Sequence, residues 1–278
     1  MAVIQIPIVN DGVRIGPTGR NGLNVLKSEW TKIRSVRSTY WTLAAAALFT
    51  VGLSAIICAV FVAQYDNLKP QDLAQFEPAS TSLTGGILAQ FAIAVLGVLV
   101  ITGEYATGMI RTTFSSVPQR LRVLRAKIAV FSALTLTVTS VACFTAFFIG
   151  QWILSTKDMG VGIGDPNVLR TVFGTALYLT ILGLLSLGIG ALIRKTAGAI
   201  SAIVGILFVV PVLAGFLPSS LEGVQKYLPS EAGTAIINAN PSATGSDLLQ
   251  AWVGMGVFAL YALVTLAAAA YFIQRRDA

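Results

Sequence analysis

Six long apolar runs divide this chain, and polar or charged segments separate them. A hydrocarbon core of about 30 Å needs about 20 helical residues to cross it. The pattern therefore predicts an all-α integral membrane protein whose six transmembrane helices form one domain over residues 39–278. The expected spans are residues 40–64, 83–102, 128–154, 171–193, 197–217 and 249–273.

Two different segments precede the first span. Residues 1–22 hold a short apolar stretch broken by Pro7 and then several glycines, which indicates an N-terminal tail rather than a secretory signal. Residues 23–38 instead predict an amphipathic helix at the membrane interface; a plain basic stretch is the alternative. The apolar and basic residues expected to define this helix are Leu26, Trp30, Ile33, Arg34 and Arg37.

The segment between the last two spans, residues 218–246, is long for a simple turn. Leu221, Val224 and Leu228 follow a helical spacing that Pro229 closes. We therefore expect one or two short helices on the outer side of the membrane. An irregular polar loop is the alternative.

Composition and charge distribution set the orientation of the spans. The chain is 55% apolar and only 11% charged, whereas soluble domains have about 25% charged residues. Most of the 19 Lys and Arg residues lie before span one, between spans two and three, between spans four and five, and after span six. The positive-inside rule then places both termini in the cytoplasm of a multi-pass plasma-membrane protein. The net charge of +7 could suggest binding to nucleic acid or anionic lipid, but its distribution favours a role in orienting the spans. We expect contact with membrane lipid and no nucleic acid partner.

The chain offers little chemistry of its own. It has no histidine, and Cys58 and Cys143 both fall inside apolar runs, where they are expected to be packing residues. No phosphate-binding loop and no pair of nucleophile and base is present, so we expect no catalytic residue, no metal site and no bound cofactor. Energy for any transport must come from a partner or from an ion gradient.

The spans contain no Asp, Glu, Lys or Arg near their middles, where an ion-coupled carrier usually needs them. Pro211 predicts a kink in span five. The polar and aromatic residues that could line a substrate path are Thr50, Ser54, Gln90, Phe208 and Phe216. Such a path suits an amphipathic drug, lipid or peptide better than an ion.

Residues 103–127 are the most informative polar segment. The helix of span two can continue from Glu104 to Ser116, and Pro118 then separates it from a basic lead-in to span three. A short helix of this kind can dock into a groove of a soluble partner protein. The alternative is that the basic residues only contact lipid phosphates and set the topology.

This segment, GEYATGMIRTTFSSVPQRLRVLRAK, resembles the corresponding loop of ABC-2 type transporter permeases. Glu104, Gly108, Pro118, Arg120 and Lys127 match the family pattern. The family's common Gly-Thr pair is inverted here as Thr107-Gly108. The amphipathic LKSEWTKIRS segment and the six-span layout are also similar to the family, and YLPSEAGTAI resembles actinobacterial members.

The resemblance implies the membrane-spanning subunit of an ATP-driven exporter. Two copies of a separate ABC ATPase subunit would bind ATP and Mg²⁺, so the chain itself would not be an enzyme. A second permease chain would complete a homodimer, with the substrate path mainly between spans one, two and five. The N-terminal amphipathic segment would be the connecting helix. The residues implied in coupling to the ATPase are Glu104, Tyr105, Gly108, Met109, Arg111, Thr113, Phe114, Pro118 and Arg120.

Two other functions compete with this interpretation. One is a carrier driven by an ion gradient, which the absence of histidine and of mid-span carboxylates disfavours. The other is a membrane protein without transport activity, such as an assembly or immunity factor. Only the family resemblance argues against it.

Overall fold

The computed structural model describes residues 22–67, 69, 73, 76–117, 119–216, 222–238 and 249–275, and every regular element in them is a helix. Six helices are long and apolar enough to cross a membrane, which confirms the predicted number of spans. They run over Arg37–Asn67, Gly86–Ala106, Arg120–Lys157, Val168–Ile193, Thr196–Ala214 and Ala251–Arg275.

Two of the spans are composite. Span one joins α2 (Arg37–Leu48), the π-helical turn η1 (Phe49–Leu53), α3 (Ser54–Gln64) and η2 (Tyr65–Asn67). Span five joins α10 (Thr196–Val204), the π-helical turn η4 (Gly205–Val209) and α11 (Val210–Ala214). Pro211 is the second residue of α11, just after η4. A proline disturbs the helix one turn before it, because it lacks an N–H and its ring meets the carbonyl of residue i−4. The irregularity expected at Pro211 is thus present as a π-helical turn.

The other four spans are single helices: α6 (Gly86–Ala106), α8 (Arg120–Leu154, continued by η3, Ser155–Lys157), α9 (Val168–Ile193) and α14 (Ala251–Arg275). Short helices connect them or lie at their ends. These are α1 (Gly22–Ser35), α5 (Pro78–Thr81), α7 (Met109–Ser116), α12 (Glu222–Gln225) and α13 (Pro229–Thr234). The pair α12 and α13 agrees with the short helices predicted between the last two spans.

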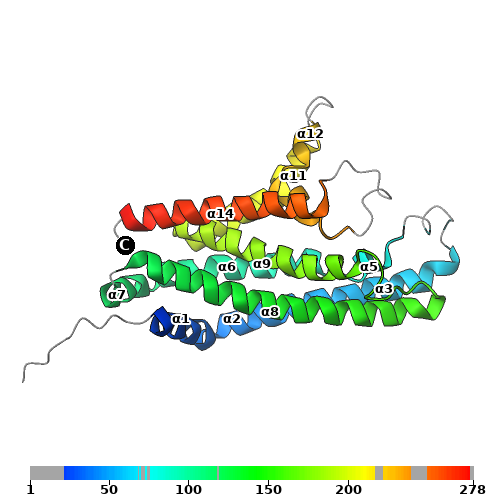
Figure 1. The fold of residues 1–278 in the computed structure, drawn as a ribbon, viewed down its shortest axis with the longest axis horizontal. Coiled ribbons are helices and arrows are strands. Elements are labelled where there is room, and N and C mark those ends of the chain that lie inside the picture. Colours follow the sequence, from blue (N-terminus) through cyan, green and yellow to red (C-terminus); the bar gives the residue numbers. More distant parts are fainter. Residues whose placement is uncertain are drawn as a thin grey trace, which may run out of the picture.

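Different elements lie at the two ends of the bundle (Figure 1). Helices α1 and α7, the first turns of α8 and the last turn of α14 lie at one end, which we call the basic end. Helix α5 lies toward the other, which we call the opposite end, and α11 and α12 project from the side of the bundle. The first and last described residues, Gly22 and Arg275, therefore lie at the same end, as an even number of crossings requires.

Two boundaries at the basic end differ from the sequence prediction. Span three begins at Arg120 rather than at residue 128, so the expected basic lead-in forms the first turns of α8. Arg, Leu and Lys are good helix formers, which explains the extension. The predicted continuous helix from Glu104 to Ser116 is wrong, because α6 ends at Ala106 and Gly108 takes a left-handed φ of 70° before α7 starts. Pro118 lies outside the described residues.

Helix α9 is the centre of the bundle and has the largest buried share of any span. It packs against α6, α8 and α14. Close helix approach replaces the hydrophobic effect as the source of stability inside a membrane, since lipid tails are as apolar as leucine. A very close approach joins Gly97 of α6 to Gly183 of α9, where a Cβ on Gly97 would lie 2.3 Å from the Gly183 carbonyl oxygen.

We predict that Gly97→Ala destabilises the bundle by about 1–3 kcal/mol, because the added methyl group forces two packed backbones apart. Thermal unfolding of the purified protein in detergent measures this. Gly103→Ala in the same helix is the matched control, since a Cβ there meets nothing within 4 Å. Equal melting temperatures for the two variants would contradict the close crossing.

Candidate functional site

The inner face of α1 carries a carboxylate between two apolar side chains. Val25, Glu29 and Ile33 follow one another at four-residue spacing and are all buried. The predicted apolar face of Leu26, Trp30 and Ile33 is therefore displaced: Ile33 is buried, Leu26 is partly buried and Trp30 is 46% exposed. Trp30 and Arg34 instead line a lateral hollow beside Tyr40. Arg37 is exposed at the start of α2.

Glu29 belongs to a network of four charged side chains at the basic end, three of them buried and the fourth, Lys32, partly exposed. The Lys127 ammonium of α8 donates to Glu29 Oε2 at 2.7 Å and to Glu104 Oε1 at 2.8 Å. Lys32 Nζ of α1 donates to Glu29 Oε1 at 2.6 Å and to Glu104 Oε1 at 3.3 Å. Glu29 and Lys127 are each 1% exposed and Glu104 is 5% exposed. We call these four residues the ion network.

Two carboxylates and two ammonium groups make the ion network neutral, which is what its burial requires. An isolated charge in a protein interior costs several kcal/mol, and only a well-bonded opposite charge offsets that cost. The four side chains come from α1, α6 and α8. If one of these helices shifted alone, an ion pair would separate and leave a charge unpaired, which is costly. The network therefore fixes the relative positions of three helices.

The ion network also reaches α7. Lys32 Nζ donates a third hydrogen bond to Thr113 Oγ1 at 3.1 Å. Ile110 on the same side of α7 is buried, and Phe114 packs against the core. The left-handed turn at Gly108 makes this possible, because it lets the chain leave α6 and return along the bundle end.

Tyr105 and Arg120 add contacts around this end. Arg194, which follows α9, lies with its guanidinium carbon 5.1 Å from the centre of the Tyr105 ring. Arg120 lies 5.3 Å from the centre of the Phe114 ring and donates from its guanidinium to the Ile273 carbonyl oxygen of α14 at 3.0 Å. The residues implied in coupling thus gather in one region, apart from Pro118, which is not among the described residues.

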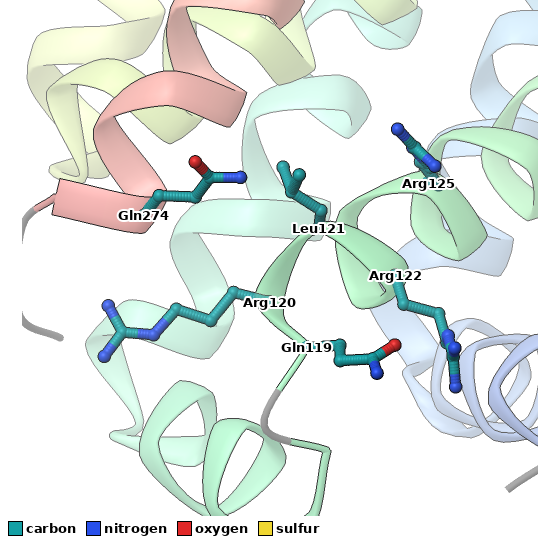
Figure 2. A pocket seen from close by; sticks show the side chains of 6 residues that line it. All are labelled: Gln119, Arg120, Leu121, Arg122, Arg125 and Gln274. Carbon is teal, nitrogen blue, oxygen red and sulfur yellow. The ribbon is translucent and has the colours of Figure 1, made fainter. Parts of the chain in front are cut away.

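A hollow lined by arginines opens beside this region. Arg120, Arg122, Arg125 and Gln119 come from the start of α8, and Gln274 comes from the end of α14 (Figure 2). The hollow has a volume of about 600 Å³. Its side chains spread in different directions rather than converge on one point. It suits a broad acidic surface better than a single small anion.

Two atoms at the basic end are buried without a hydrogen-bond partner in the described part of the chain: Glu104 Oε2 and the Tyr105 hydroxyl. A mostly apolar cavity of about 260 Å³ lies beside Glu104, between the α1–α2 corner and α6. Lys32, Glu104 and Lys127 are the charged residues of its lining. The ion network therefore has this cavity on one side and packed helices on the other.

The five candidate path residues separate into two groups. Gln90 and Phe208 line one cavity near the opposite end. Thr50 and Ser54 are buried in helix contacts: Thr50 donates to the Ala46 carbonyl, and Ser54 accepts from the Gly85 N–H. Phe216 is 82% exposed at the end of span five and does not line that cavity.

Sequence reasoning identified Glu104 and Lys127 by resemblance but missed Glu29 and Lys32 as their partners. The sequence does hold a signal for Glu29: it lies between Val25 and Ile33 at four-residue spacing, in a row that is otherwise apolar.

Among the described residues, no group of three or more His, Cys, Asp or Glu side chains is placed to hold a metal ion. Comparison with models of known protein families and with curated protein sequences found no match to this chain.

We predict that Lys127→Met lowers the free energy of unfolding by about 3–5 kcal/mol, because it leaves two buried carboxylates with one ammonium group. Denaturation in detergent measures the loss. The matched control is Lys157→Met, which removes an exposed ion pair to Asp66 at the opposite end. That change should cost no more than about 1 kcal/mol.

The double variant Lys127→Met/Glu104→Gln tests the same network by restoring its neutrality. It should be more stable than Lys127→Met alone, since the unpaired charge is gone. A double variant that is no more stable than the single one would refute the electrostatic explanation.

Lys32 gives the ion network a pH dependence. Burial lowers the pKa of Lys32, but the hydrogen bond and charge of Glu29 and those of Glu104 more than offset it, so the pKa lies above the ordinary 10.5. A base with a raised folded-state pKa stabilises the fold fully below its unfolded pKa and loses that effect as the pH rises through the folded value. The stability difference between the wild type and Lys32→Met should stay constant from pH 7 to about 9.5 and shrink above about 10.5. A difference that already shrinks between pH 7 and 9 would contradict the assignment; thermal melting at each pH measures it.

Proposed function

We propose that this chain is the permease subunit of an ATP-driven exporter of the ABC-2 type, with the basic end in the cytoplasm against a separate ATPase subunit. The observation that carries the proposal is the way in which α7 is attached to the bundle. This short helix is exposed on one side, and on the other it is tied through Thr113 and Lys32 to the ion network of α1, α6 and α8.

The exposed side of α7 has the composition of a docking surface. Met109, Arg111, Thr112 and Ser115 are exposed, whereas Ile110 is buried and Phe114 is half-buried. Met and Arg are enriched where proteins bind one another. The arginine-lined hollow beside α7 supplies further positive charge for an acidic partner surface.

A docked ATPase could pass its movement directly to the spans. Pressure on α7 acts through Thr113 on Lys32, and the ion network joins Lys32 to the end of span two at Glu104 and to the start of span three at Lys127. Because the charged atoms are buried, they are held more strongly than exposed pairs would be. The ion network would then serve as the connection between connecting helix, coupling helix and spans.

The energy source and the assembly follow from the same proposal. No phosphate-binding loop is present in the sequence, so ATP and Mg²⁺ would be held by two ATPase subunits. Spans one and five have the least buried surfaces of the bundle, which fits a substrate path between this chain and a second copy of it. The orientation with both termini in the cytoplasm follows from the basic residues at one end.

We predict that Arg111→Ala weakens binding of the ATPase subunit by about tenfold, the usual cost of losing one charged hydrogen bond at an interface. The measurement is co-purification of the permease with co-expressed ABC ATPase subunits from the same genome, followed by titration of the purified permease with the subunit that binds. ATP hydrolysis by the assembled complex should fall in parallel.

The matched control is Arg34→Ala, which removes the same charge at the same end. Arg34 follows Lys32 by two positions and so lies on a different side of α1 from the ion network. It should leave ATPase binding unchanged. Equal binding by Arg111→Ala and the wild type would contradict docking on α7. Transport that persists without any ATPase and stops with an ionophore would instead favour the ion-driven carrier.

A further inference from the structure

A second cavity lies toward the opposite end, between span two, α9, span five and α13, and has a volume of about 290 Å³. Gln90 of α6 and Tyr178 of α9 form its floor and are joined by a 2.8 Å hydrogen bond from the Tyr178 hydroxyl to Gln90 Oε1. Leu207, Phe208 and Pro211 give one wall an apolar and aromatic character. The cavity thus has room for the apolar part of a drug-sized molecule.

The remaining wall comes from α13 and adds a charge. Glu231 lines the cavity together with Ser230 and Thr234. Within the described part of the chain, the Glu231 carboxylate makes no hydrogen bond or ion pair, and no Lys or Arg lines this cavity. The Ser230 hydroxyl is also without a hydrogen-bond partner there. A half-buried carboxylate that has no cationic neighbour is free to pair with a bound cation.

The aromatic side chains point to the same kind of ligand. Phe208 is 51% exposed and contacts Phe91, with ring centres 5.3 Å apart and ring planes tilted by 40°. The face of an aromatic ring attracts a cation, most strongly where water is excluded. A carboxylate beside aromatic and aliphatic side chains is a suitable setting for an ammonium or phosphonium group with an apolar body.

The geometry points to a binding site for an amphiphilic cation in this cavity, with Glu231 facing the positive charge and Leu207, Phe208 and Pro211 facing the apolar body. This inference rests on the proposed function in one respect: it names the substrate class that the exporter would carry. It also changes the expectation of an uncharged path, because Glu231 lies outside the six apolar runs and reaches the cavity only through the fold of α13.

Two ions of almost equal shape and opposite charge provide the test. Tetraphenylphosphonium and tetraphenylborate are titrated separately onto the purified full-length chain in dodecyl maltoside, which carries no ammonium group, and empty micelles give the background. Tetraphenylphosphonium should bind saturably. Tetraphenylborate should show no saturable binding.

Three variants locate the binding. Glu231→Gln should weaken tetraphenylphosphonium binding by at least about tenfold, since it removes the charge and keeps the shape. Phe208→Ala, at an exposed ring, should weaken it by several-fold. Asp158→Asn removes an exposed carboxylate after η3, also toward the opposite end and outside the cavity, and should leave binding unchanged. Thermal melting of each variant checks that the fold is intact.

Equal binding to the wild type and Glu231→Gln, equal binding of both ions, or no saturable binding to the wild type would each overturn the inference. The assay contains no ATPase, so its result is independent of whether an ATPase drives transport. If tetraphenylphosphonium binds through Glu231 but no ATPase associates with the chain, the binding site stands and the exporter assignment fails. If the ATPase binds and the cation does not, the opposite holds.

Discussion

The buried ion network is the constraint on which the basic end of this protein depends. Glu29, Glu104 and Lys127 can be buried only together and with the partly exposed Lys32, because each carboxylate needs an ammonium group within hydrogen-bond distance. Apolar residues would fill the same space with less specificity, since they tolerate sliding and repacking. The charged set instead allows essentially one relative placement of α1, α6 and α8. Burying these charges costs free energy, but it gives α1, α6 and α8 a defined arrangement beneath α7.

The rest of the bundle divides into a packed part and a more exposed part. Helix α9 lies at the centre and contacts α6, α8 and α14, and its glycines allow close approach. Spans one and five are the least buried, and each contains a π-helical turn. Such turns often occur at functional sites, because they interrupt the regular hydrogen bonding at a single point. In the proposed exporter, these two spans are the parts best suited to bend against a fixed centre.

The sequence predicted the class of fold because apolar length and basic loops are strong signals in a membrane protein. It also predicted that a short helix follows span two. It could not place Gly108 as the end of one helix and the start of another, because a glycine is tolerated within helices as well as after them. It could not find Glu29 or Glu231 as site residues, since both lie in segments that look amphipathic or loop-like and meet their partners only in three dimensions. Gln90 and Phe208 were predicted as path residues and do line one cavity, whereas Thr50 and Ser54 are occupied by helix contacts.

Helix α6 connects the two chemical regions through a regular spacing. Gln90, Gly97 and Glu104 are separated by seven residues each, so they lie nearly on one face, which drifts by only about 20° per interval. Gln90 accepts a hydrogen bond from Tyr178 at the cavity, Gly97 meets Gly183 at a close helix crossing, and Glu104 belongs to the ion network. The two outer residues are about 21 Å apart along the helix axis. The close crossing at Gly97 prevents α6 from sliding freely past α9, but a tilt about this point would move Gln90 and Glu104 in opposite directions. A displacement imposed at the ion network would then reach the cavity through one rigid helix, without a chain of side-chain rearrangements between them.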